Sequence, residues 1–194
     1  MNIPSPDQCL QLIEKMEMMS HIIDHSRMVQ RVAKTLTHFL RQDNPHLNQE
    51  LILAGAILHD ITKTRSIATG ERHAQTGGAL LARLGYFEVG EIVRQHVVID
   101  QTIDRNIDHN IITEAAIVNY ADKRVLHDQV VPLEDRLSYI LKRYGTSQRA
   151  VERIKLMWKD TILLEQALFK NLDITPASIR KHVLDLSWAI NKLP

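Results

Sequence analysis

The sequence predicts an all-α fold, and three observations support the prediction. Apolar residues recur with the 3.6-residue period of a helix along nearly the whole chain, rather than alternating as they do in a half-buried strand. The periodic segments end at residues that typically stop helices, such as Asp43-Asn44-Pro45, Gly85 and Gly145. Hydrophobic residues make up 44% of the 194 residues, which is enough to build the core of one helical domain.

Each expected helix carries an apolar stripe, and the segments are 6–19, 25–42, 48–59, 71–84, 86–98, 111–126, 132–144, 147–171 and 176–190. Thr69-Gly70 separates the third segment from the fourth. Thr175-Pro176 gives the last segment a capping threonine and a proline in its first turn. Residues 61–70 and 99–110 are polar, and we expect them to form loops.

Composition argues against several classes of protein. The net charge of +1 gives no electrostatic case for a nucleic-acid partner or a membrane surface. The single cysteine, Cys9, cannot form a disulfide within the chain, which favours a reducing compartment. The N-terminus lacks the basic start and apolar core of a signal peptide, and no apolar run approaches the ~18 residues of a membrane span. We therefore expect a cytoplasmic protein with no membrane and no nucleic acid among its partners.

Ionisable residues fall on the core-facing stripes of five predicted segments. Each lies about one turn from the apolar residues of its stripe or directly after them, near a helix end. The His59-Asp60 pair, for example, follows the apolar run 51–58. Burying such groups without partners costs several kcal/mol, roughly. The set is His25, His59, Asp60, His73, His96 and Asp122.

A shared metal centre is the simplest partner for this set. One buried histidine is ordinarily a neutral imidazole bonded to a backbone carbonyl, but six inward groups would each need a partner of their own. Imidazole nitrogen and carboxylate oxygen suit Fe, Mn, Zn or Co. Six ligands are too many for one ion that also keeps a water, so we expect two metals bridged by a carboxylate. A second pair, His127-Asp128, follows no buried run and is interpreted as a surface pair at a helix end.

The order of these residues resembles the HD-domain metal-dependent phosphohydrolase superfamily. The resemblance rests on HSRMVQRVA (25–33), AGAILHDITK (54–63), HAQTGGALLARLG (73–85), VRQH (93–96) and NYADKR (119–124). It implies an HD-type helical bundle, with one domain over 1–194, a metal-site core at about 20–126 and additional C-terminal helices at about 132–194. With the additional His73 and His96, the pattern resembles the subset of the superfamily that binds two metals. That subset includes the cyclic-di-GMP phosphodiesterases and the diadenosine tetraphosphate hydrolases. The sequence departs from HDIGK at Thr62 and lacks a GYP-like stretch.

The resemblance also implies roles for the site residues. Asp60 would bridge the metals, with His25, His59 and Asp122 at the first and His73 and His96 at the second. The ions would be two divalent metals, Fe or Mn in the first place, with Zn, Co, Ni and Mg as alternatives. Asp60 and Lys63 would be catalytic. The residues expected to contact substrate phosphate are Lys63, Arg72, Lys123 and Arg124, with solvated surface charge as the alternative for Arg72 and Arg124.

The function implied is a phosphohydrolase. A dinuclear metal-activated water would cleave a phosphate ester or anhydride of a small nucleotide-like substrate. Two alternatives stay open from the sequence, a di-iron oxygenase resembling myo-inositol oxygenase and a non-catalytic, nucleotide-sensing regulator. The C-terminal helices are expected to pack on the core and close one side of the cleft. Residues 147–171 are a candidate homodimer contact.

Overall fold

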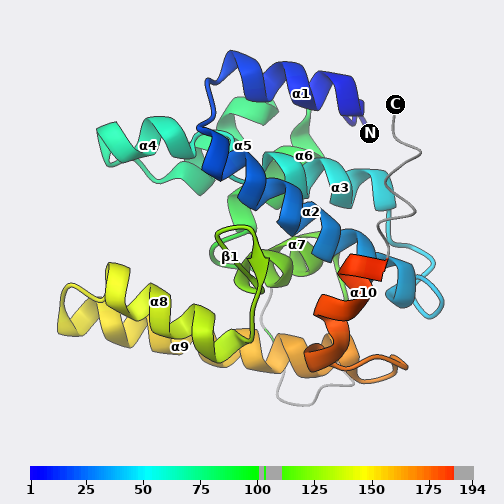
Figure 1. Ribbon diagram of the computed structural model, residues 1–194. Helices are drawn as coiled ribbons and strands as arrows, with labels where there is room; N and C mark the ends of the chain where they lie inside the picture. Colours follow the sequence, from blue (N-terminus) through cyan, green and yellow to red (C-terminus); the bar gives the residue numbers. More distant parts are fainter. Residues whose placement is uncertain (101–102, 104–110, 186–194) are drawn as a thin grey trace.

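The computed structural model describes residues 1–100, 103 and 111–185, and their regular structure is almost entirely helical (Figure 1). The all-α prediction is confirmed. In chain order the elements are α1 (Pro6–Lys15), α2 (Ser20–Leu40), α3 (Gln49–Leu58), α4 (Lys63–Thr69), α5 (His73–Arg83), α6 (Phe87–Gln95), α7 (Glu114–Lys123), β1 (Val125–Leu126), β2 (Gln129–Val130), α8 (Leu133–Tyr144), α9 (Gln148–Phe169), the 3-10 turn η2 (Pro176–Ser178) and α10 (Ile179–Asp185). Among the described helices, none has the length and apolar character needed to cross a bilayer.

Helix α3 is the central element and packs against α2, α6 and α7. It is apolar on nearly every side, as expected for a helix enclosed by others. Small residues let its neighbours come close, and Gly55 is the tightest point. A Cβ added at Gly55 would lie 2.6 Å from Cγ2 of Ile92 on α6, so only glycine fits this contact.

Helices α5 and α6 form the most tightly packed pair of the fold. A Cβ added at Gly78 on α5 would lie 2.7 Å from the carbonyl oxygen of Gly90 on α6, and the reverse contact is equally short. The two backbones therefore touch directly. Because the chain reverses between these helices, the start of α5 and the end of α6 lie side by side, which brings His73 next to His96.

Several expected boundaries differ from the structure, and the helices expected over 6–19 and 86–98 end earlier, at Lys15 and Gln95. Residues 61–70, predicted as a loop, contain α4, which buries none of its residues and so lacks the apolar stripe that identified the other helices. The predicted helix 111–126 ends at Lys123, because Val125-Leu126 leaves it to pair with β2 in an antiparallel hairpin. The helix predicted from residue 25 begins at Ser20. Residues 101–102, 104–110 and 186–190 of the predicted segments lie outside the described residues.

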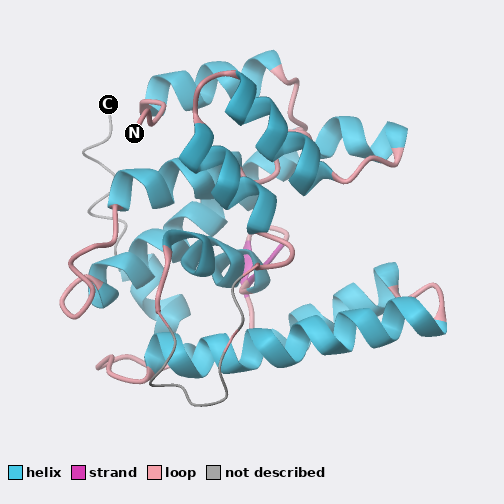
Figure 2. Ribbon diagram, turned by 180° about the vertical axis from the view of Figure 1, so that it is seen from behind, coloured by secondary structure: helices cyan, strands magenta, loops and turns pink. Residues whose placement is uncertain are grey.

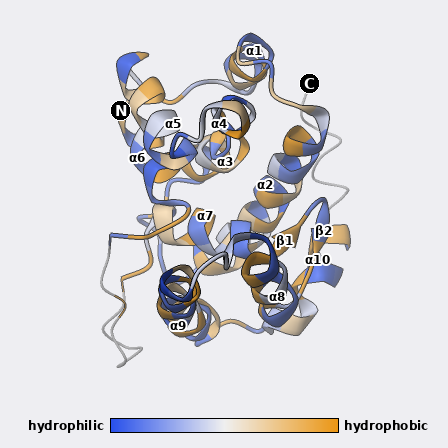
Figure 3. Ribbon diagram, turned by 90° about the vertical axis from the view of Figure 1, so that its left-hand side faces the viewer, coloured by the Kyte–Doolittle hydropathy of each residue, from blue (hydrophilic) through white to orange (hydrophobic). Residues whose placement is uncertain are grey.

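The helices α8 and α9 form an antiparallel hairpin, called the arm here, which extends from one side of the molecule (Figures 1 and 2). Helix α9 packs on α7 and buries Trp158, Leu164 and Leu168, whereas α8 packs chiefly on α9. Figure 3 shows hydrophilic and hydrophobic residues on both arm helices, as the predicted amphipathic stripes require. Helix α10 returns to pack on α2. The organisation of 1–194 as one HD-type domain stays a prediction.

Candidate metal centre

Six side chains from five segments meet inside the helical bundle. One comes from α2, two follow α3, and one each comes from the start of α5, the end of α6 and the last turn of α7. The contact between His25 and Asp122 joins residues 97 positions apart, with 3.0 Å between His25 Nε2 and Asp122 Oδ1. The six are the residues selected from the sequence, His25, His59, Asp60, His73, His96 and Asp122.

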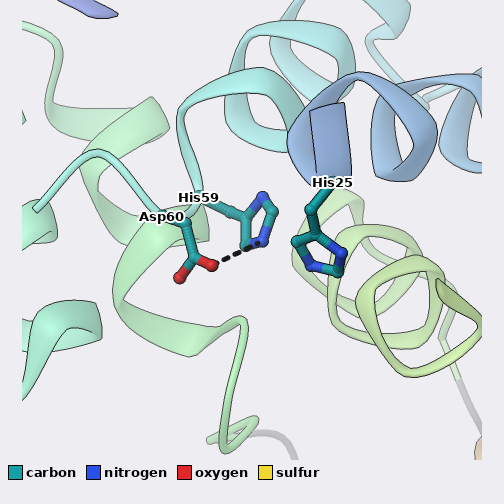
Figure 4. Close-up of side chains that lie close together, drawn as sticks. All are labelled: His25, His59 and Asp60. Carbon is teal, nitrogen blue, oxygen red and sulfur yellow. Dashed lines mark ion pairs between the residues drawn. The ribbon is translucent and has the colours of Figure 1, made fainter. Parts of the chain in front are cut away.

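Asp60 lies between two groups of ligand atoms. Its Oδ2 is 3.5 Å from His59 Nε2, and His25 lies beyond the His59 ring (Figure 4). Asp122 Oδ1 is 3.8 Å from the same His59 nitrogen. Its Oδ1 is 3.1 Å from His73 Nε2 and 3.6 Å from His96 Nε2. Oδ2 therefore faces His59, and Oδ1 faces the pair His73 and His96. The donor atoms form two sets, and the atoms of each set all lie within 4.8 Å of one another. Asp60 belongs to both sets, with His25 and His59 in one and with His73 and His96 in the other.

Backbone carbonyls orient three of the four imidazoles. The Nδ1 of His59 is 2.8 Å from the Ala56 carbonyl oxygen, and the Nδ1 of His96 is 2.6 Å from that of Val93. Both histidines cap the C-terminus of a helix, where the carbonyls of the last turn lack partners within the helix. With Nδ1–H donated to a carbonyl, the lone pair of Nε2 points into the cluster, which is the usual arrangement of a metal-binding histidine.

The third orienting carbonyl comes from the β-hairpin. His25 Nδ1 lies 2.8 Å from the carbonyl oxygen of His127, in the two-residue turn between β1 and β2. The side chain of His127 is exposed, and its backbone has a positive φ of 55°, a conformation that non-glycine residues adopt infrequently. This contact could not be predicted from the residue types, because every residue carries a backbone carbonyl.

Burial fixes the protonation state of the central histidine. His59 is fully buried, and burial lowers its pKa to about 4, so the ring is neutral near pH 7. Its Nε2 has no hydrogen-bond partner among the described residues, and neither has Asp60 Oδ1. Buried polar atoms of this kind are rare in native proteins unless an ion or water satisfies them.

The two carboxylates remain ionised despite their burial. Burial alone would raise the pKa of Asp60, but the field of His59 and the neighbouring imidazoles of His73 and His96 hold it well below its usual value. Burial likewise opposes ionisation of Asp122, and the hydrogen bond from His25 and the charge of Arg136 hold its pKa well below the usual value. Neutral imidazoles and ionised carboxylates are the forms that bind a divalent cation. The donor set and its unpartnered atoms therefore fit metal ions.

The four cations predicted to contact phosphate lie in different surroundings. Lys63 is at the cluster, with its Nζ 3.9 Å from Asp60 Oδ1 and 3.2 Å from His73 Nε2, and its side chain is 27% exposed. Arg72, just before α5, is exposed. Lys123 and Arg124 are both buried. The structure thus places Lys63 beside the metal-binding atoms, and among the described residues it shows no contact of the other three side chains with those atoms.

Lys123 and Arg124 have structural partners instead. Lys123 Nζ donates to Asn119 Oδ1 at 2.7 Å and to the carbonyl of His96 at 3.4 Å, which ties α7 to the end of α6. Arg124 donates to the hydroxyl of Tyr120 at 2.6 Å and to the carbonyl of Pro176 at 2.9 Å, which holds the segment after α9. We do not include these two residues among the proposed phosphate contacts.

Sequence reasoning missed one cation at the site. Arg136, in the first turn of α8, places its Nη2 3.4 Å from Asp122 Oδ1. It lies in a segment where we found only the amphipathic pattern of a packing helix, and nothing in that pattern relates α8 to α7. The signal is spatial, because the β-hairpin folds α8 back toward the ligands.

Comparison with known proteins gives a family match over the part of the chain that holds all six ligands. The family model described as HD domain matches residues 22–125. An uncharacterised protein of Methanocaldococcus jannaschii is 25% identical over 146 residues, which is 71% of this chain and 85% of that protein. A tRNA (cytidine(56)-2'-O)-methyltransferase of Thermoplasma volcanium is 29% identical over 161 residues, which is 72% of this chain but only 46% of that protein. No solved structure matches.

Proposed function

Because this chain belongs to the HD domain family, we propose that it is a metal-dependent phosphohydrolase that cleaves a phosphate ester or anhydride of a small nucleotide-like substrate. The observation that carries the proposal is Asp60, whose Oδ2 faces His59 while its Oδ1 faces His73 and His96. A carboxylate in this position is suited to bridge two cations. The methyl transfer in the name of the Thermoplasma relative is not carried over, because the chain spans less than half of that protein.

In the proposal, the protein provides two adjoining ligand sets. His25, His59, Asp60 and Asp122 would hold one divalent cation, and Asp60, His73 and His96 would hold the other. Two divalent cations bound there would make hydroxide available near neutral pH and offset the charge of a phosphoryl group. Fe and Mn are the first choices, and Zn, Co, Ni and Mg are alternatives that this ligand chemistry also admits.

Asp60 and Lys63 are the residues we propose as catalytic. Asp60 would hold both ions at a fixed separation. Lys63 lies next to Asp60 Oδ1 and His73, and its partly exposed ammonium would donate a hydrogen bond to a phosphoryl oxygen of the substrate. The carbonyls of Ala56 and Val93, which accept from the Nδ1 atoms of His59 and His96, would keep both rings in the orientation that metal binding needs.

Metal content and hydrolysis, measured on the same protein, test the proposal. Protein purified anaerobically without a nickel column is expected to carry about two Fe or Mn ions per chain and to release phosphate or a nucleotide from a panel of phosphate esters and anhydrides. Asp60→Ala should lose metal and at least about a thousandfold in activity, because one side chain serves both ions. Asp128→Asn, at an exposed carboxylate, is the matched control.

Three results separate the proposal from its alternatives. Full activity in both His59→Ala and Asp60→Ala would refute it. Oxygen consumption with an organic substrate, and no hydrolysis, would favour the di-iron oxygenase. Nucleotide binding without turnover by the metal-loaded protein would favour the regulator.

A further inference from the structure

Among the described residues of the arm, Arg136 is the one whose side chain contacts a proposed metal ligand. Its Nη2 is 3.4 Å from Asp122 Oδ1, and its side chain is 14% exposed. Its Nε is buried and has no hydrogen-bond partner among the described residues. A buried guanidinium nitrogen without a partner is costly, so this atom is available to a ligand that the protein itself does not supply.

Asp122 does not account for this arginine. The same Oδ1 atom that Arg136 contacts is 3.0 Å from His25 Nε2 and 3.8 Å from His59 Nε2. If Asp122 binds a cation, as proposed, its charge is already compensated. Two carboxylates balance only one of two divalent cations, so a further positive group beside them is repelled until an anion arrives.

The arginine and Lys63 lie at opposite ends of the ligand cluster. Lys63 is beside Asp60 Oδ1 and His73, in the second ligand set, whereas Arg136 is beside Asp122, in the first. The ring of Tyr139, one turn along α8, packs against the guanidinium with its centroid 5.8 Å from Arg136 Cζ. This contact limits the movement of the guanidinium. A planar guanidinium fork matches two oxygens of a phosphoryl group, which an ammonium cannot do.

We propose that Arg136 is a substrate-binding residue, which holds a phosphoryl group of the substrate at the Asp122 end of the site while Lys63 serves the other end. The inference rests on the proposed function and deepens it, because it assigns the arm a part in recognition. A residue that only positioned Asp122 would instead be needed for metal binding. The two roles therefore predict different effects on metal content and on anion binding.

The experiment uses the metal-loaded full chain and inorganic phosphate as the probe. Phosphate affinity is measured by calorimetry and metal content by elemental analysis, for wild type, Arg136→Gln, Arg136→Lys and the control Arg143→Gln, an exposed arginine on the same helix. We expect Arg136→Gln to keep its metal and melting temperature but to bind phosphate at least about tenfold more weakly. Arg136→Lys should recover part of the loss, because it keeps the charge but not the fork. Arg143→Gln should match wild type.

Two results would overturn the assignment of Arg136 alone. Unchanged phosphate affinity in Arg136→Gln would remove it from the anion site, and loss of metal in that variant would make it a positioning residue for Asp122. In both cases the wild type still binds phosphate and the proposed function stands. Absence of phosphate binding by metal-loaded wild type would overturn this inference, and if hydrolysis were also absent the proposed function would fail with it.

Discussion

The helices that hold the candidate metal centre and the helices of the arm are built on different principles. Helices α2 to α7, called the body here, enclose α3 and approach each other closely at small residues such as Gly55 and Gly78. The arm is two amphipathic helices that lie side by side (Figure 2), pack largely on each other and expose many of their polar residues. The family match ends at residue 125, before the arm begins.

From this contrast we infer that the body and the arm have different roles, metal binding for the body and substrate binding for the arm. The body carries all six candidate ligands. Three of its imidazoles, those of His25, His59 and His96, are held by a backbone carbonyl at a helix end or in the β-hairpin turn. The arm sends one buried cation, Arg136, to the edge of that cluster. We therefore expect changes in the body to alter metal content and changes in the arm to alter substrate binding or stability.

The metal-free body should be sensitive to acid. His59 has a folded pKa of about 4, below the roughly 6.5 of an unfolded histidine, so the unfolded state takes up the proton first. The free energy of unfolding should therefore be highest above about pH 6.5 and fall by on the order of 2–3 kcal/mol as the pH drops toward 4. The pKa of His73 is also lowered, by burial, and acts in the same direction.

His25 opposes this trend in part. Burial lowers its pKa, but the hydrogen bond and charge of Asp122 outweigh burial and raise it, so His25 stabilises the fold below about pH 6.5. Urea denaturation of chelator-treated protein between pH 7.5 and 4.5 measures the sum. His59→Asn should flatten the dependence, and His38→Asn, at an exposed histidine of α2, should not. The same pH dependence in His59→Asn as in wild type would contradict the burial-driven shift of His59.

Close helix packing in the body should matter more for the metal centre than helix ends in the arm. Gly55→Ala places a methyl group 2.6 Å from Ile92 Cγ2, and overpacking of this kind costs about 1–3 kcal/mol. Because α3 and α6 end at His59 and His96, forcing them apart should also lower metal content. Thermal melts and elemental analysis measure the two effects.

A variant in the arm provides the matched comparison. The Ser147 side chain caps α9 by accepting from the backbone N–H of Ala150, at 3.2 Å. Ser147→Ala should cost about 1 kcal/mol and leave metal content unchanged. If it lowers metal content as much as Gly55→Ala does, the division between body and arm is wrong.

The sequence was sufficient for the fold class and for the set of residues that converge, because both depend on periodicity. A histidine one helical turn from an apolar stripe lies on the same face as that stripe, so its position in the sequence predicts that it points toward the core. The same geometry explains why two cations expected to contact phosphate lie away from the metal-binding atoms. Lys123 and Arg124 adjoin Asp122 in sequence, but neighbours on a helix point about 100° apart. They therefore turn to Asn119 and Tyr120 rather than to the ligands.

Other features left no periodic signal. Helix α4 buries nothing, so its sequence has the composition of a loop. Val125-Leu126 continues the apolar period of α7, and only pairing with β2 makes it a strand. Arg136 sits in an ordinary amphipathic segment, and its place at the site depends on how the β-hairpin turns the chain. Sequence periodicity describes one element at a time, and these features arise between elements.

The smallest expected effect lies at the junction between body and arm. His127 has φ 55° in the turn that connects them, and glycine adopts a positive φ without the steric cost borne by other residues. His127→Gly keeps the carbonyl that accepts from His25 Nδ1 but loses the ring contact with Tyr139. We expect a gain of at most about 1 kcal/mol in stability and unchanged metal content.

His127→Val is the opposing variant. A β-branched residue at positive φ is strained, so the turn should shift and the carbonyl with it. We therefore expect His127→Val to melt at a lower temperature and to hold less metal than either His127→Gly or wild type. If His127→Gly also loses metal, the imidazole of His127, and not its backbone carbonyl, supports His25. The exposed pair His127-Asp128 would then have a part in the site that its surface position conceals.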